Sequence, residues 1–173
     1  MYPISGVRFA TVNAGIKSGN GEDVTLIVLE AETVVAGLFT KSMTRSAPVI
    51  DCQNKIGMEI KNNGAAIIIN AGNANAFTGR QGEIAVHEII AALSKRVEVP
   101  VERIFSSSTG VIGEPLEYEK IINVLDYLVD SVHEAKIEDA ARAIMTTDTF
   151  PKGSSVELGD EGSKIKISGI AKG

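Results

Sequence analysis

The residue pattern with the clearest chemical potential is Ser106–Gly113, where four hydroxyl side chains and two glycines follow a short apolar stretch. We predict a strand over Val101–Phe105, then a loop, and a helix opening at Glu114–Pro115, where the N–H that proline lacks has no partner to lose. Backbone N–H groups at such a helix N-terminus can hold a phosphate, a carboxylate or a developing oxyanion. The same pattern is typical of an ordinary helix cap, and no Gly-Lys-Ser/Thr completes a P-loop.

Two further segments concentrate small polar side chains. Asn70–Asn75 carries three amides on a glycine-containing loop, which can orient a polar substrate, but asparagine is also favoured where φ is positive. Thr146–Thr149 offers hydroxyl groups to a ligand, and it equally fits the last turn of a helix running into Phe150–Pro151. The residues alone leave both segments open between a binding role and a purely structural one.

Residues that commonly act as nucleophiles, bases or metal ligands are scarce. His87 and His133 are expected on helices and facing solvent, without Cys or His neighbours at ligand spacing, so no metal site is predicted. Cys52 has no cation beside it before Lys55, and we expect a buried, inert thiol. Lys172 is the last charged residue of the sequence. No Ser-His-Asp set can be assembled from these residues.

Composition limits the class of protein. The chain has 173 residues, 44% hydrophobic and 23% charged, which excludes disorder and predicts a single domain over residues 1–173. The net charge is −5 without a run of Lys or Arg, so nucleic acid is not an expected partner. The longest apolar run, Ala65–Ile69, is too short to span a bilayer, and no signal peptide or cysteine pair is present. We therefore expect no membrane partner and a cytoplasmic location.

The elements that position these residues are strands first and helices later. Runs of β-branched residues predict strands over Val24–Leu29 and Thr33–Phe39. A third strand is expected over Ala65–Asn70, where the absence of alternation indicates burial on both faces. This strand leads directly into the amide-rich loop.

Helical spacing of apolar residues predicts a helix over Arg80–Arg96, a second over Pro115–Val132 and a third over Ile137–Met145. The first of these helices is expected to cross over between two strands. A weakly alternating segment, Lys164–Ile170, closes the chain. This order predicts a mixed α/β (α+β) fold.

Six segments, in their order along the chain, together resemble the ornithine acetyltransferase family, the glutamate N-acetyltransferases of arginine biosynthesis. Each segment alone is a weak signal, but the set is specific and covers the chain from end to end. The segments are Gly37–Thr40, Ala47–Val49, Asn70–Ala76 with Thr78–Gly79, Ser107–Gly113, Ile144–Thr149 and Gly169–Gly173.

The resemblance implies a particular organisation. Members of the family are made as a precursor that cleaves itself just before a threonine, and the two products stay together as α and β chains. This sequence resembles the α chain, and it ends at Gly173, before the small-residue stretch that leads to the cleaved bond. The implied nucleophile is the N-terminal Thr of the β chain, which is not in this sequence. The implied sheet is packed with helices and completed by the β chain, in a heterotetramer of two α and two β chains.

The resemblance also implies the chemistry. The threonine hydroxyl, with the new α-amino group as base, attacks the acetyl carbonyl of N2-acetylornithine, and the acetyl group then passes to glutamate. Thr109 and Gly110 match the oxyanion-hole pair of the family, and Thr146 and Lys172 match its substrate contacts. No metal or bound cofactor is implied, and the residues leave open whether acetyl-CoA also serves as donor.

Two alternatives stay open. A self-processed N-terminal-nucleophile amidohydrolase or aminopeptidase would pass the same acyl group to water rather than to an amine. A non-catalytic anion-binding domain would use Ser106–Gly113 alone and would be a stable monomer of 173 residues. The acetyltransferase interpretation instead predicts that the α chain alone is poorly soluble, because the β chain covers its sheet edge.

Overall fold

The computed structural model describes residues 1–59, 64–160 and 164–172, and their strands form a four-stranded and a two-stranded sheet. The larger sheet has the order β1-β2-β3-β4, antiparallel between β1, β2 and β3 and parallel between β3 and β4. The smaller sheet is an antiparallel β5–β6 hairpin. The strands are β1 (Val7–Val12), β2 (Val24–Leu29), β3 (Ala65–Asn73), β4 (Ile104–Val111), β5 (Lys152–Leu158) and β6 (Ile165–Ala171).

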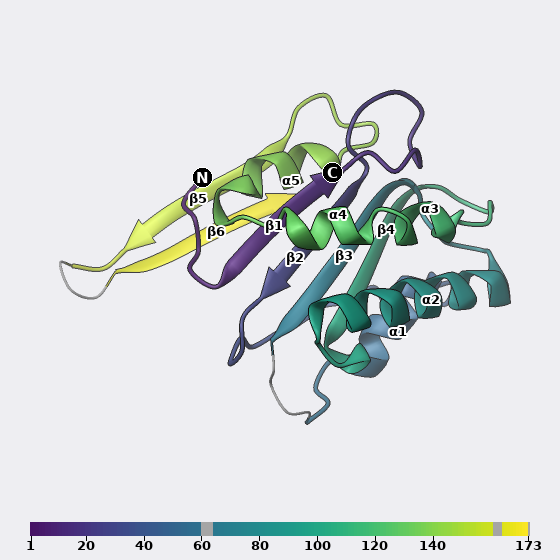
Figure 1. Ribbon diagram of the computed structural model, residues 1–173, viewed down its shortest axis with the longest axis horizontal. Helices are drawn as coiled ribbons and strands as arrows, with labels where there is room; N and C mark the ends of the chain where they lie inside the picture. Colours follow the sequence, from purple (N-terminus) through teal and green to yellow (C-terminus); the bar gives the residue numbers. More distant parts are fainter. Residues whose placement is uncertain (60–63, 161–163, 173) are drawn as a thin grey trace.

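Helices cover the larger sheet (Figure 1). Helix α2 connects β3 to the parallel strand β4, so the predicted crossover helix is confirmed. The mixed α+β class is confirmed as well. The helices are α1 (Ala47–Lys55), α2 (Gly79–Val97), α3 (Tyr118–Ile122), α4 (Leu125–Asp130) and α5 (Ile137–Ala143), with short 3₁₀ turns at Val101–Arg103 and Glu134–Lys136.

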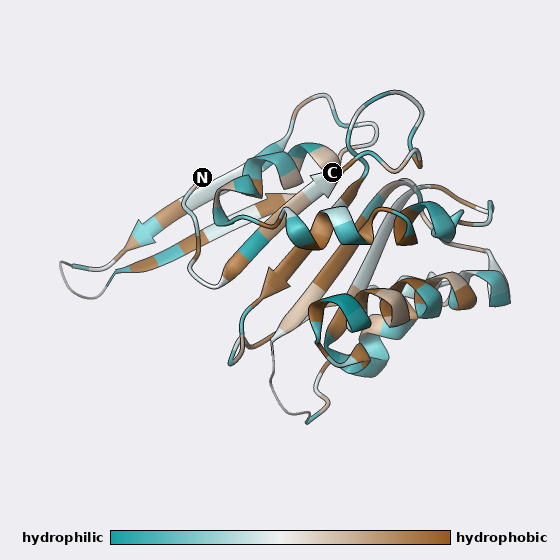
Figure 2. Cartoon of the chain, in the orientation of Figure 1, coloured by the Kyte–Doolittle hydropathy of each residue, from teal (hydrophilic) through white to brown (hydrophobic). Residues whose placement is uncertain are grey.

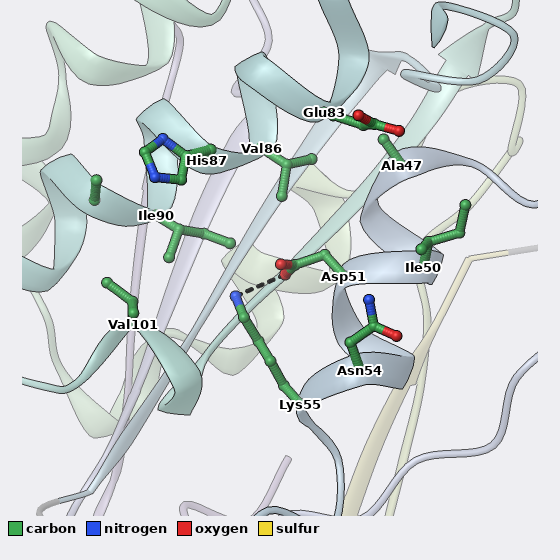
Figure 3. Close-up of a pocket in the computed structure, with 11 residues that line it drawn as sticks. Ala47, Ile50, Asp51, Asn54, Lys55, Glu83, Val86, His87, Ile90 and Val101 are labelled. Carbon is green, nitrogen blue, oxygen red and sulfur yellow. Dashed lines mark hydrogen bonds and ion pairs between the residues drawn. The ribbon is translucent and has the colours of Figure 1, made fainter. Parts of the chain in front are cut away.

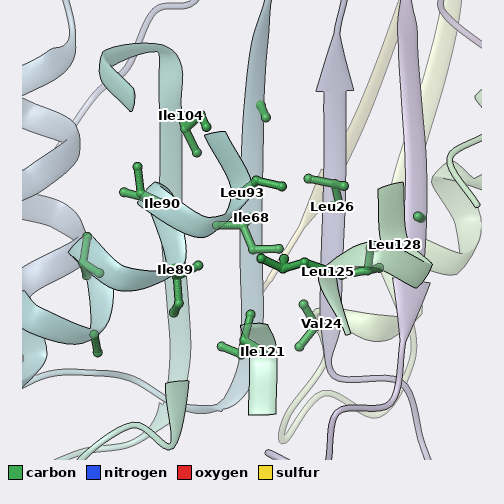
Figure 4. Close-up of a cluster of buried hydrophobic side chains, with 14 of the residues drawn as sticks. Val24, Leu26, Ile68, Ile89, Ile90, Leu93, Ile104, Ile121, Leu125 and Leu128 are labelled. Carbon is green, nitrogen blue, oxygen red and sulfur yellow. The ribbon is translucent and has the colours of Figure 1, made fainter. Parts of the chain in front are cut away.

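The main core lies between the sheet and helices α2, α3 and α4 (Figure 4). Its strand side chains are Leu26, Ile68 and Ile104, and each is almost fully buried. Figure 2 shows the apolar central strands beneath helices whose outer faces are hydrophilic. Burying each such Leu or Ile side chain contributes roughly 1.5–3 kcal/mol. The helix side chains that meet these residues include Ile89, Ile90, Leu93, Ile121, Leu125 and Leu128.

The opposite face of the sheet carries two smaller clusters. Phe9 of β1 packs with Ile137 and Ala140 of α5, and Ile170 of β6 joins them. Cys52 of α1 packs with buried residues of β3 and β4 at the other side of the sheet. On this face Ile67 and Ile69 of β3 are only half-buried. The predicted burial of β3 on both faces is therefore complete on one face and partial on the other.

The structure corrects two local predictions. Residues 33–39 form no strand, and Val34 and Leu38 are exposed there rather than packed against a sheet. The predicted helix over Pro115–Val132 begins only at Tyr118 and breaks after α3. At the break, Val124 N donates to Ile121 O, three residues back rather than four, which interrupts the α-helical ladder.

The sequence patterns also left three elements unassigned. Strands β1 and β5 and helix α1 were not foreseen. The predicted third helix and the predicted terminal strand are present as α5 and β6. Among the described residues, no helix has the length and apolar character needed to cross a lipid bilayer.

Candidate functional site

The hydroxyl-rich run Ser106–Gly113 is mostly strand, which overturns the interpretation of it as a loop at a helix N-terminus. Strand β4 extends through Val111, and α3 begins only at Tyr118. The serines pair along β3, with Ser107 opposite Ile69. The backbone N–H groups of this segment therefore do not lie at the positive end of a helix dipole.

Strand β4 instead offers backbone groups at the edge of the sheet. Two α1 side chains donate to its carbonyls: Lys55 Nζ to Ile104 O at 3.1 Å and Cys52 Sγ to Ser106 O at 3.2 Å. Both carbonyls therefore point away from β3. Gly110 lies further along the same strand, where its φ of +136° departs from the extended conformation.

Gly110 is required by its backbone conformation and by its surroundings. Its φ is +136°, and a Cβ there would lie 2.6 Å from Asn73 N and closer still to the Gly72 carbonyl. Gly72, with a φ of +117°, has a similar constraint, because its Cβ would lie 2.8 Å from Ile16 O. Three backbone segments, from the β1–β2 loop and the ends of β3 and β4, are thus packed directly on one another.

Two asparagines near the end of β3, Asn70 and Asn73, hold this arrangement together. Asn70 Nδ2 donates to Asn73 O at 2.9 Å, and its Oδ1 accepts from Ser108 Oγ at 2.6 Å. Asn73 Nδ2 donates to Glu114 O at 3.1 Å. The two amides therefore join the end of β3 to β4 and to the chain that follows β4.

Asn75 connects the same segment to helix α2. Its φ is +46°, its Nδ2 donates to Gly82 O at 3.0 Å, and its Oδ1 accepts from Thr78 Oγ1 at 2.9 Å. Its backbone N–H donates to Asn73 Oδ1 at 2.7 Å. The contacts of the three asparagines are with the chain itself, which favours the structural interpretation of Asn70–Asn75.

The β1–β2 loop joins the glycine pair to the end of α5. Asp23, which is buried, accepts from the backbone N–H groups of Ile16 at 2.6 Å and Lys17 at 2.9 Å. Lys17 Nζ then donates to Ala143 O at 3.3 Å and Met145 O at 3.1 Å. A lysine at these carbonyls satisfies acceptors that the helix end leaves free. It also fixes the chain immediately before Thr146.

Thr146 and Lys172 both contact Asp148. The backbone N–H of Thr146 donates to Asp148 Oδ2 at 3.1 Å, and Lys172 Nζ lies 2.7 Å from the same oxygen. Lys152 Nζ lies 2.6 Å from Oδ1. Lys152 and Lys172 are brought together by the hairpin, whose register places Lys152 opposite Ala171.

The site residues predicted from the sequence therefore lie at the end of the structure where β1, β3, β4 and β6 finish (Figure 1). Thr109 is half-buried and Gly110 exposed at the end of β4, and the contacts through Gly72 and Lys17 link that end to Thr146. Sequence reasoning missed Lys17, Asp23 and Asp148. For Asp148, its place two residues after Thr146 is the one signal in the sequence.

Two hollows are not lined by Thr109, Gly110, Thr146 or Lys172, although the second reaches Ser108, the neighbour of Thr109. One, of about 350 Å³, lies between α1 and α2; in it Asp51 and Lys55 form a 2.7 Å ion pair, and His87 lies across from them on α2 (Figure 3). Another, of about 330 Å³, lies beside β4 and is lined in part by Phe39, Phe105 and Ser107. The candidate site is an open sheet end rather than either hollow.

The predictions for cysteine and histidine have mixed outcomes. Cys52 is buried, as expected, and burial is the main cause that raises the pKa of its thiol above the ordinary value of 9.0. His87 is exposed on α2. His133 is exposed but not helical, because its backbone exchanges hydrogen bonds with Phe9 of β1. Within residues 1–59, 64–160 and 164–172 there is no cluster of three or more His, Cys, Asp or Glu able to hold a metal.

The fold and site define a mixed α+β protein in which the β1–β2 loop connects a glycine pair at the end of a mixed sheet to an Asp–Lys cluster. The chain belongs to the ArgJ family, whose model matches residues 8–173. It is 52% identical over 170 residues to an arginine biosynthesis bifunctional protein ArgJ from Ruegeria pomeroyi, covering 98% of this chain and 41% of that protein. A protein of the same name from Bartonella quintana is 44% identical over 171 residues, covering 99% of this chain and 41% of that protein.

Two solved structures are similar over nearly the whole chain. The arginine biosynthesis bifunctional protein argJ from Bacillus halodurans has a TM-score of 0.86 at 28% identity, covering 98% of this chain and 87% of that chain. The ornithine acetyltransferase from Mycobacterium tuberculosis, complexed with ornithine, has a TM-score of 0.86 at 31% identity, covering 99% and 89%. The chain thus spans about two-fifths of the length of these curated relatives, but most of the length of each solved chain.

Proposed function

We propose that this chain is the α subunit of a cytoplasmic glutamate N-acetyltransferase of arginine biosynthesis, which moves acetyl from N2-acetylornithine to glutamate. The observation that supports the proposal is a series of contacts that runs from Gly110 through Gly72 and Lys17 to the chain before Thr146, which shares Asp148 with Lys172. The family of the chain, and the ornithine bound to the Mycobacterium tuberculosis enzyme, support this reaction over other acyl transfers.

A partner chain is part of the proposal. The curated relatives are more than twice as long as the matched region, whereas the solved chains are only slightly longer, which supports a precursor cut into two pieces. We infer that the second piece is the β chain, in a heterotetramer of two α and two β chains. Exposed apolar side chains on the hairpin offer it a surface, and they are Val156, Leu158, Ile165 and Ile167.

The chemistry follows from the residues at the sheet end. The hydroxyl of the β-chain threonine attacks the acetyl carbonyl carbon, and its proton passes through the threonine α-amino group to the departing ornithine amine. Charge develops on the carbonyl oxygen and is stabilised by the N–H of Gly110 and the hydroxyl of Thr109. Each such donor typically contributes about 3 kcal/mol to transition-state stabilisation.

Lys172 and Thr146 hold the substrate in this scheme. The ammonium of Lys172 is 25% exposed and can form a charge-assisted hydrogen bond with the carboxylate of N2-acetylornithine and later of glutamate. The amine of glutamate then attacks the acetyl-threonine and restores the threonine hydroxyl. No metal or bound cofactor takes part, and acetyl-CoA is a second acetyl donor if the enzyme is bifunctional like its named relatives.

The test begins with a denaturing mass spectrum of the full-length gene product. Two chains, the second beginning with Thr, are expected, and labelled acetyl should move from N2-acetylornithine to glutamate. A single uncut chain without transfer would overturn the proposal. Release of acetate at a rate independent of glutamate would instead indicate an amidohydrolase.

Variants of β4 test the oxyanion pair separately. Thr109→Val keeps the shape of the side chain and removes the hydroxyl, so kcat is expected to fall about 10²-fold. Ser107→Ala, on the same strand and exposed, is the matched control and should leave kcat near wild type. Chain cleavage is scored by mass in both variants. Equal kcat for the two variants, each fully cleaved, would exclude the role of Thr109.

A further inference from the structure

The carboxylate of Asp148 is a buried charged group beside the candidate site. Its side chain is 1% exposed. One carboxylate oxygen, Oδ2, accepts from the Thr146 N–H at 3.1 Å and pairs with Lys172 Nζ at 2.7 Å. The other, Oδ1, pairs with Lys152 Nζ at 2.6 Å. Both residues that the proposed function assigns to the substrate are therefore held by one oxygen of one side chain.

We propose that Asp148 is a positioning residue of the acetyl-transfer site, which orients Lys172 and Thr146 for the carboxylate-bearing substrate. This inference rests on the proposed function, because it takes Lys172 and Thr146 as substrate contacts. Asp148 itself does not touch the substrate. It acts through the ammonium of Lys172 and through the backbone that carries the Thr146 hydroxyl.

The free-energy cost of burying the Asp148 carboxylate argues against a purely stabilising role for its ion pairs. Burying a carboxylate removes its hydration, and the attraction of its partners often no more than offsets that loss. The β5–β6 hairpin provides a comparison, because Lys164 and Glu157 pair at 2.8 Å with exposed fractions of 53% and 26%. The hairpin thus has an ordinary surface pair at one end and a buried, multiply bonded carboxylate at the end next to the site.

Orientation matters for a lysine in particular. Its ammonium is carried on a flexible four-carbon stem, and fixing that stem costs conformational entropy. In this structure Lys172 lies just beyond β6, with its ammonium already held by Asp148. The entropic cost of ordering the Lys172 side chain is therefore met before the substrate binds, and the substrate binds more tightly as a result.

The test uses a double-mutant cycle in the full-length, processed enzyme, with KM for N2-acetylornithine as the main readout. Asp148→Asn keeps the volume of the side chain and removes its charge, and we expect KM to rise about tenfold through the loss of an oriented charge-assisted contact. Lys172→Ala should raise KM at least as much. The oxygen of the Asn side chain can still accept from the Thr146 N–H, so the change should act through Lys172, and KM of the double variant should stay within about twofold of that of Lys172→Ala.

Lys164→Ala is the matched control, because it removes an ion pair of the same hairpin without touching Asp148. Its KM should equal that of the wild type. The same cycle is run with Asp148→Glu, which keeps the charge and shifts it by one methylene, so the test stands even if Asp148→Asn does not fold. In that cycle KM should rise less than in Asp148→Asn, again without a further rise when Lys172 is also replaced.

Two results would overturn the inference. One is a folded, processed Asp148 variant with wild-type KM. The other is a double variant whose KM rises by the product of the two single effects, which would mean that Asp148 and Lys172 act independently. Failure of the proposed function looks different, because the wild-type enzyme itself would then move no acetyl group to glutamate.

Discussion

Lys172 Nζ and Asp148 Oδ2 lie 2.7 Å apart, although the whole β5–β6 hairpin separates the two residues in sequence. The hairpin register brings them together, since Lys152 pairs with Ala171 and the two strands begin and end beside Asp148. A terminal lysine that has no assignable role from its local sequence thus becomes part of an ordered site.

For Lys172→Ala we predict a much larger effect on substrate use than on stability. Lys152 Nζ still pairs with the other oxygen of Asp148 at 2.6 Å, so thermal stability should change little, whereas KM for N2-acetylornithine should rise about tenfold. Steady-state kinetics and a thermal melt of the processed enzyme measure both. Kinetics identical to the wild type would contradict the substrate role of Lys172.

Gly110→Ala is predicted to unfold or strongly destabilise the protein. A Cβ at Gly110 would overlap the backbone of Gly72 and Asn73, and the φ of +136° is itself strained for alanine, so the expected loss is above about 2 kcal/mol. Gly113→Ala is the matched control, because Gly113 also has a positive φ but open space around it, and it should cost about 1 kcal/mol. Denaturant titration compares the two, and equal losses would show that the packing on Gly72 is unimportant.

Lys17→Met should loosen the end of α5 while keeping most of the side-chain volume. It removes the donors to Ala143 O and Met145 O, for an expected loss of about 1 kcal/mol. Hydrogen exchange should rise first around Met145 and Thr146. Lys120→Met is the comparison, because Lys120 Nζ donates to Gly15 O in the same loop but not to α5. Equal exchange near Thr146 in both variants would argue against a link from Lys17 to the site.

Cys52 should make stability fall at high pH. Burial raises the pKa of the folded-state thiol above the ordinary value of 9.0, so the unfolded chain loses its proton first as pH rises. The free energy of unfolding contributed by the neutral thiol is therefore complete below about pH 8 and declines above about pH 9. In Cys52→Ala this decline should be absent, which urea titrations at both pH values measure. Parallel pH profiles would contradict a raised pKa.

The local sequence was sufficient to predict several helices and strands. The runs at Val24–Leu29 and Lys164–Ile170 and the apolar stripe over Arg80–Arg96 correspond to β2, β6 and α2. The β–helix–β order also predicted the parallel pairing of β3 with β4. For β2 and α2 the hydrophobic period and the final burial agree, because the same side chains face the main core.

Elsewhere tertiary contacts decided the outcome. The β-branched residues of 33–39 fit a strand, but Val34 and Leu38 are exposed and the segment forms no strand. Ser106–Gly113 is typical of a loop, yet pairing with β3 makes most of it strand. In both cases the local pattern is compatible with two structures, and long-range pairing selects one.

The candidate site divides in the same way. The residue types and their resemblance to a family were sufficient to nominate Thr109, Gly110, Thr146 and Lys172 from the sequence. Only the tertiary structure decided how they are held. Gly110 packs directly on the backbone of Gly72, and Lys172 pairs with the buried carboxylate of Asp148. The physical reason is that a motif records which groups are present along the chain, whereas orientation and burial depend on strand register and on backbone approaches between segments distant in sequence.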